Sequence, residues 1–177
     1  ASNAREAYDE ASYCISLIRD YQITYPVAFD WELDGDYDSV TEACETFCNV
    51  ISSYGYKPMV YSNRNRWYNN FDGEKIASKY KVWMAAYFGK FYYDSVRWTY
   101  GDDLPNFRYH YDMWQYSSRC YVDGISGQVD VDIAFFGYAN YHVDTKDAVL
   151  TVTNKEIKRT YGDGIGRLTE ELNLLDG

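Results

Sequence analysis

The chain has 177 residues and a formal net charge of −10, which argues against nucleic acid and anionic membrane surfaces as partners, because both recruit Lys and Arg. It contains no run of about 18 apolar residues, so no membrane-spanning helix is predicted. The 21 Tyr and 5 Trp either fill a core or offer a ligand apolar ring faces with polar tips. Sugar rings suit such surfaces, so a polysaccharide partner is compatible with the composition.

Helices and strands are predicted to alternate along most of the chain. An apolar stripe predicts a helix over residues 3–20, a capping box beginning at Ser39 starts a second helix that ends near Tyr54, and Gly55 ends it in a left-handed conformation. A short helix is predicted over 64–71, and a long Tyr-rich loop over 88–107. Strands are predicted over 27–32, 58–62, 81–87 and 109–116. This alternation indicates βα units around a parallel sheet.

The character of the sequence changes after about residue 141. Residues 149–153 and 156–158 alternate like exposed strands, so residues 145–177 are predicted to be a linker and the start of a β-type module. The four cysteines, Cys14, Cys44, Cys48 and Cys120, lack the CxxC spacing of a metal site. A disulfide among them cannot be assigned from the sequence, and neither a metal nor a cofactor is predicted. His110 and His142 have no nucleophile pattern or zinc spacing around them, so neither is given a role.

The sharpest local signal is Asp30-Trp31-Glu32 at the end of an apolar strand. Residues two apart in a strand point to the same side, so Asp30 and Glu32 are expected to emerge together. Two carboxyl groups held close resist simultaneous ionisation, so one pKa should rise. Glycoside hydrolysis needs such an acid, together with an anion that stabilises the cationic transition state. On the triplet alone, two carboxylates solvated by water or bridged to arginine remain the alternative interpretation.

Three further positions are candidates from the pattern. Asp130 is a third acidic candidate, and a turn-capping aspartate is its alternative interpretation. Trp114 and Gln115 end the fourth predicted strand, where they would stack on a sugar and hydrogen-bond to it. For Trp114, a place in a core aromatic cluster is the alternative.

Five ordered segments together resemble the family 25 lysozymes, across roughly residues 4–138. They are Pro26–Glu32, Met59–Ser62, Val82–Tyr87, Trp114–Ser118 and Val122–Asp130. The resemblance implies an α/β fold, an irregular TIM-like βα barrel, and metal-independent N-acetylmuramidase activity on peptidoglycan. The bond cut would be the β-1,4 link from N-acetylmuramic acid to N-acetylglucosamine. The enzyme would be secreted or associated with the cell wall, although the N-terminus shows no signal pattern.

The resemblance also assigns roles at the matching positions. Glu32 is similar to the family's proton donor, Asp30 to its acidic partner and Asp130 to a further active-site aspartate. Tyr61, Tyr87 and Trp114 match aromatic residues that line the sugar groove. The family-like domain is expected to span residues 1–144.

The chain departs from the family pattern at its beginning. Members of the family start with a strand that carries another active-site aspartate, followed by two more βα units, and this sequence starts at what resembles the helix before the D-x-E strand. The barrel is therefore expected to lack its first strands and to leave an open edge. A fragment, a proteolytic product or self-association with another copy is expected, and a catalytically incomplete glycan-binding fragment is the alternative to an active lysozyme.

Overall fold

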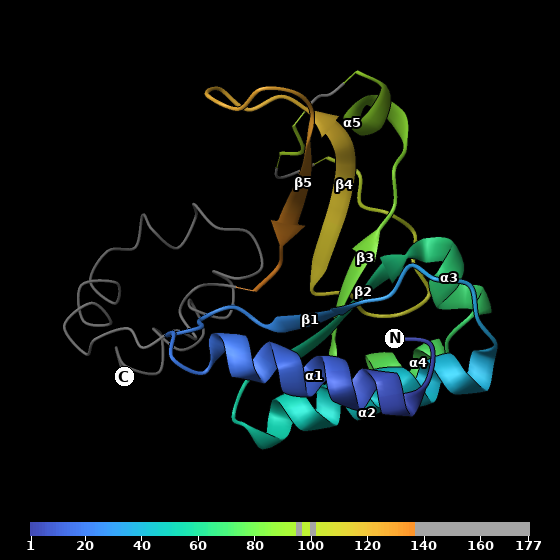
Figure 1. The fold of residues 1–177 in the computed structure, drawn as a ribbon. Coiled ribbons are helices and arrows are strands. Elements are labelled where there is room, and N and C mark those ends of the chain that lie inside the picture. The colour runs from blue at the N-terminus through green and yellow to red at the C-terminus, as the bar shows by residue number, and fades with distance from the viewer. Residues whose placement is uncertain (95–96, 100–101, 137–177) are drawn as a thin grey trace, which may run out of the picture.

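The computed structural model describes residues 1–94, 97–99 and 102–136. Five strands form one sheet in the order β1-β2-β3-β4-β5. Their bounds are Val27–Asp30 (β1), Pro58–Asn63 (β2), Lys81–Ala85 (β3), Met113–Cys120 (β4) and Val129–Ala134 (β5). Strands β1 to β4 are parallel, and β5 is antiparallel to β4. The strands rotate progressively from β1 to β5, so the sheet curls into a half-barrel (Figure 1).

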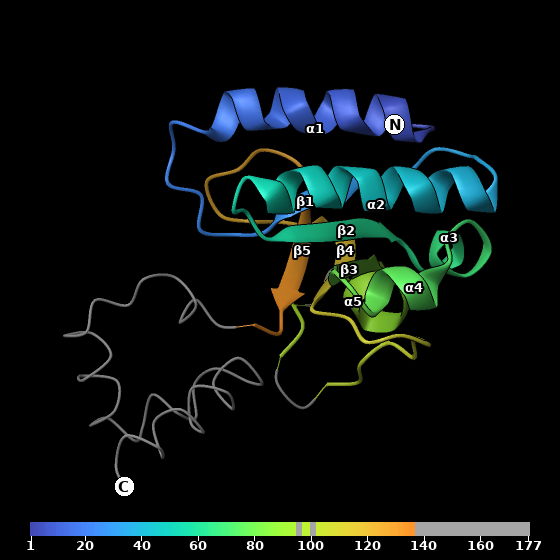
Figure 2. The same ribbon diagram turned by 90° about the horizontal axis from the view of Figure 1, so that it is seen from below.

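Five helices accompany the sheet in the described residues. They are α1 (Ala4–Ile18), α2 (Tyr37–Ser53), α3 (Arg64–Asn69), α4 (Gly73–Ala77) and α5 (Gly89–Tyr93). Figure 2 shows α1 and α2 as successive layers on one side of the sheet. Helix α1 buries Ala7, Ala11 and Ile15, which recur at helical spacing and form one face that packs on α2.

The alternation of side chains along the strands gives the sheet two different faces. One face is apolar and meets the helices: Phe29 packs on Phe47 of α2 with ring centroids 4.9 Å apart, and Trp31 packs on Phe71 at 5.3 Å. The opposite face carries Asp30, Tyr61, Trp83, Gln115 and Asp132, which the strand register brings into two neighbouring rows. We call this second face the polar face.

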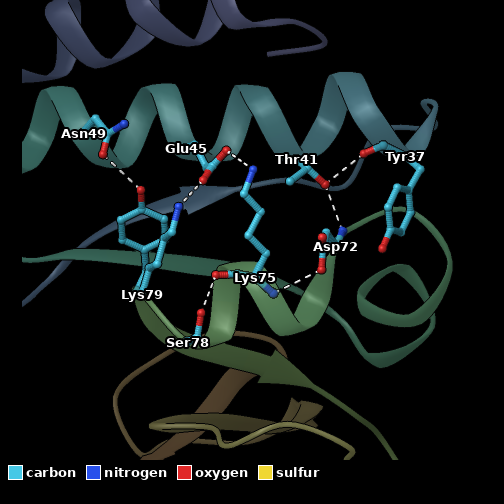
Figure 3. Close-up of polar contacts among 9 residues, drawn as sticks. Tyr37, Thr41, Glu45, Asn49, Asp72, Lys75, Ser78 and Lys79 are labelled. Atoms are coloured by element: carbon cyan, nitrogen blue, oxygen red, sulfur yellow. Dashed lines mark hydrogen bonds and ion pairs between the residues drawn. The ribbon is translucent and has the colours of Figure 1, made fainter.

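Helix α4, which the sequence did not predict, is attached to α2 by polar contacts (Figure 3). The Glu45 carboxylate accepts hydrogen bonds from Lys75 and Lys79. The Thr41 hydroxyl accepts from the backbone N–H of Asp72 at 2.8 Å, and Asp72 in turn caps α4. These contacts fix the connection between β2 and β3.

The predicted end of the second helix near Tyr54 is confirmed, whereas its predicted start and cap at Ser39 were wrong. Helix α2 begins at Tyr37, and the Asp36 side chain accepts from the backbone N–H of Ser39 at 2.9 Å. Ser39 therefore lies within the first turn. Asp36, three residues earlier, supplies the capping acceptor that the sequence had assigned to Ser39. The prediction for Gly55 is confirmed, with φ +85°.

The fourth strand begins four residues later than predicted. Residue Asp112 holds the chain before β4: its carboxylate accepts from the Val82 backbone N–H at 3.0 Å and from Lys81 Nζ at 2.8 Å. The Asp112 backbone also donates to Val82 O and accepts from the Phe135 N–H, both at 2.8 Å, so the chain already lies beside β3 one residue before β4 begins. The third strand ends at Ala85, before the predicted Tyr87, and the predicted 88–107 loop contains α5. Strand β5 was not predicted.

Cys14, Cys44, Cys48 and Cys120 form no disulfide. No helix in the described part of the chain is long and apolar enough to cross a membrane, and among the described residues no three His, Cys, Asp or Glu side chains group as metal ligands would. His142, the boundary at residue 144 and the predicted 145–177 module lie outside the described residues.

Candidate active site

The two carboxylates of the D-x-E triplet lie at the carboxyl end of β1. Asp30 is the last residue of the strand, Glu32 follows two residues later, and both are exposed. Between them, Trp31 points the other way and is 1% exposed. Its backbone N–H donates to Tyr61 O at 3.1 Å, and its carbonyl accepts from Ser62 Oγ at 2.7 Å. Strand β2 therefore fixes the backbone from which both carboxylates project.

Asp30 shows the electrostatic effect expected of a close acidic pair. Partial burial at the strand end raises the pKa of Asp30, and the neighbouring Glu32 raises it further. Burial and the neighbouring carboxylate both disfavour the charged form of Asp30. The expectation that one pKa of the pair rises is thus met at Asp30.

Tyr61 and Tyr87 meet at one buried amide beside these carboxylates. Tyr61 donates its hydroxyl to Gln115 Oε1 at 2.8 Å, and Tyr87 donates to the same oxygen. Gln115 is 5% exposed and Tyr61 8%, whereas Tyr87 is 40% exposed. Burial, followed by the nearby Tyr87 and then Glu32 and Asp30, raises the pKa of Tyr61 well above its ordinary value, so its hydroxyl remains a donor at neutral pH. With Oε1 occupied twice, the amide NH₂ of Gln115 is oriented away from both phenols.

Asp130 lies on β5 and is exposed. Burial raises the pKa of Tyr87, and Asp130 is the largest electrostatic contribution, with Glu32 a smaller one. The charges of Asp130 on β5 and of Glu32 beside β1 therefore both act on Tyr87. The structure brings Asp30, Glu32, Tyr61, Tyr87, Gln115 and Asp130 to one region of the polar face.

Trp114 is the candidate that the structure places elsewhere. It is fully buried on the helix-covered face, where it stacks on Phe88 with centroids 5.5 Å apart and donates its indole N–H to Ala86 O at 2.9 Å. Adjacent strand residues point to opposite faces, so Trp114 and Gln115 cannot both face a ligand. The interpretation of Trp114 as a sugar-stacking residue is therefore wrong, and the alternative of a core aromatic is correct.

Two residues of the polar face were not among the sequence candidates. Trp83 donates its indole N–H to Asp132 Oδ1 at 2.7 Å. Burial raises the pKa of Asp132 to about 6, and Asp130 beside it contributes in the same direction. The D-x-D alternation of Asp130 and Asp132 is the same signal that singled out Asp30 and Glu32, and it would have pointed to Asp132.

Paired carboxylates at the carboxyl edge of a curled parallel sheet, beside hydrogen-bonded tyrosines, form the arrangement expected of a glycoside hydrolase. The comparison with known proteins agrees. Residues 1–125 match the model of glycosyl hydrolases family 25, and the chain belongs to that family.

Individual relatives are similar over part of their length. The chain is 32% identical over 123 residues to the lysozyme of Streptococcus phage Cp-1, covering 64% of this chain and 32% of that protein. It is 30% identical over 131 residues to the D-alanyl-L-alanine endopeptidase of Streptococcus phage B30, covering 72% and 28%. Among solved structures, the CTP1L endolysin superposes with a TM-score of 0.58 at 26% identity, covering 76% and 43%. The chain thus spans less than half the length of these relatives.

Proposed function

We propose that this chain carries catalytic carboxylates of a cell-wall lysozyme that hydrolyses the β-1,4 bond between N-acetylmuramic acid and N-acetylglucosamine in peptidoglycan. The observation that carries the proposal is the Asp30 and Glu32 pair, held at the end of β1 beside Tyr61. Membership of family 25 and the similarity to a phage lysozyme support it. An enzyme of this kind acts at the cell wall, outside the membrane.

The residues take distinct roles in this proposal. Glu32 donates a proton to the leaving glycosidic oxygen, the role that its place in the family 25 motif gives it, and it lies just beyond the end of β1. Asp30 is its acidic partner, a second carboxylate at the end of β1 whose pKa is raised by partial burial and by the neighbouring Glu32. Asp130 supplies negative charge on the opposite side of the site, which stabilises the oxocarbenium-like transition state. Tyr87, which is 40% exposed, offers its ring to the sugar, and the hydrogen bonds of Tyr61 and Tyr87 to Gln115 fix the wall of the sugar groove.

The half-barrel belongs, in this proposal, to an irregular TIM-like barrel. Among the described strands β1 pairs only with β2, so no described strand covers its other edge. Further strands, or a second copy of the chain, would cover that edge. Cross-linking of the purified chain, compared with a longer form of the protein, distinguishes the two.

The test is digestion of purified peptidoglycan, with products read by mass spectrometry for new reducing-end muramic acid. Glu32→Gln is expected to lower the rate by at least a hundredfold, because general acid catalysis contributes on the order of 10²–10⁴. Glu42→Gln is the matched control: the same change at an exposed carboxylate on α2. Wild-type activity in the Glu32 variant would refute the assignment.

A glycan-binding module without turnover is the second candidate. It is favoured by the exposed ring of Tyr87, which its hydrogen bond to Gln115 holds beside the carboxylates. Calorimetry that detects glycan binding while no product forms would support it. Turnover by this chain alone would exclude it.

A further inference from the structure

The Trp83 side chain crosses a whole strand of the sheet. Trp83 is on β3 and Asp132 is on β5, and β4 lies between them. Neighbouring strands are about 4.8 Å apart, so β3 and β5 are separated by roughly 9.6 Å. A direct bond of 2.7 Å between the two side chains therefore requires the indole to lie over β4. Met113 is the register partner of Trp83 there, and Gln115 is that of Asp132.

The same indole is contacted from the other side by Tyr61. Their ring centroids are 4.7 Å apart at 60°. A continuous row thus runs across the polar face from Tyr61 on β2, through Trp83, to Asp132 on β5. The row begins beside Asp30, the register partner of Tyr61. Trp83 is only half-buried, so part of the indole remains available to a ligand.

Asp132 fixes the direction in which this indole lies. A carboxylate acceptor makes a shorter and stronger bond than a neutral one, and an indole has a single N–H to donate. The other groups near Asp132 are acidic or neutral: Asp130 is the charged neighbour that acts on it, and Gln115 lies opposite it. Without this acceptor, nothing described at the β5 end would hold the ring across β4.

We propose that Asp132 is a positioning residue, which through the Trp83 indole N–H holds Trp83 flat across β4 as the floor on which a sugar ring of the substrate stacks. The inference rests on the proposed lysozyme function and deepens it. It assigns to Trp83 the sugar-stacking role that Trp114 cannot fill. Asp132 itself acts through Trp83 and does not touch the substrate.

The kinetic test uses soluble peptidoglycan fragments and compares kcat and KM for the wild type, Asp132→Ala, Trp83→Phe and the double variant. Both single variants are expected to raise KM about tenfold and to change kcat less than threefold, because they disturb binding and leave the carboxylates in place. The KM of the double variant should not exceed that of the single variant with the higher KM, because both substitutions remove the same contact. Asp132→Asn keeps an acceptor oxygen and is expected to restore most of the loss. Asp130→Asn, by contrast, should lower kcat.

An NMR measurement tests the contact independently of activity. The indole N–H resonance of Trp83 is expected to titrate with Asp132 near pH 6 in the wild type and to lose that titration in Asp132→Asn. Folding of each variant is checked by thermal unfolding.

The two proposals fail in different ways. If the wild type neither cleaves nor binds glycan, the proposed function fails and the stacking role fails with it. If the wild type is active, the inference is overturned by a normal KM in Trp83→Phe, by additive losses in the double variant, or by a Trp83 resonance indifferent to Asp132.

Discussion

Replacing the buried Gln115 amide tests how the polar face is held together. In Gln115→Met the side chain keeps its length and loses the oxygen that accepts from Tyr61 and Tyr87. Tyr61 is 8% exposed, so its hydroxyl cannot turn to water, whereas Tyr87 is 40% exposed and can. A buried donor left without a partner costs about 1–3 kcal/mol. Gln115→Met is therefore expected to lower the free energy of unfolding by about 1–3 kcal/mol.

The two tyrosine variants should cost less, and in a definite order. Tyr61→Phe removes one hydrogen bond while Gln115 still accepts from Tyr87, so a loss of about 0.5–1.5 kcal/mol is expected. Tyr87→Phe should cost less than about 0.5 kcal/mol, because water replaces the bond at an exposed hydroxyl. The double variant Gln115→Met/Tyr61→Phe leaves no buried hydroxyl unpaired, because the exposed Tyr87 hydroxyl turns to water, and it should be more stable than Gln115→Met alone.

Urea unfolding followed by circular dichroism and tryptophan fluorescence measures these differences, provided that the m-value is unchanged. The reasoning would be refuted if Tyr87→Phe cost as much as Gln115→Met. It would also be refuted if the double variant were less stable than Gln115→Met, because the penalty would then not come from the stranded Tyr61 hydroxyl.

Three other predictions concern particular contacts. Asp36→Ala should destabilise the fold by about 1 kcal/mol in urea unfolding and Ser39→Ala by less than half as much, since Asp36 is the cap; equal losses would contradict this. Trp67 Nε1 finds no acceptor within the described residues, whereas Trp114 Nε1 donates to Ala86 O, so Trp114→Phe should cost about 1–3 kcal/mol more than Trp67→Phe. The pKa of Asp132 rises from 3.8 to about 6 on folding, so the folded state holds the proton more tightly than the unfolded state. As the pH rises from about 4 to about 6, the free energy of unfolding of the wild type should therefore fall relative to that of Asp132→Asn, by up to about 2 kcal/mol after solvent screening. A pH-independent difference would exclude this.

Much of the architecture follows from local patterns in the sequence. The alternation of apolar strands with amphipathic helices predicted a parallel sheet with its helices, and the first helix lies within the predicted range. The D-x-E triplet placed both carboxylates at the end of β1, because strand geometry has a period of two. Gly55 was identified from its position after a helix.

Tertiary structure decided which strands became neighbours and which way each aromatic faced. The sequence left Trp114 between core and groove, and only the register of β4 against β3 put it in the core and Gln115 on the polar face. The bond from Trp83 to Asp132 joins residues 49 positions apart across an intervening strand, so no local period could indicate it. Local chemistry specifies where carboxylates emerge, but the long-range pairing of strands determines what they face.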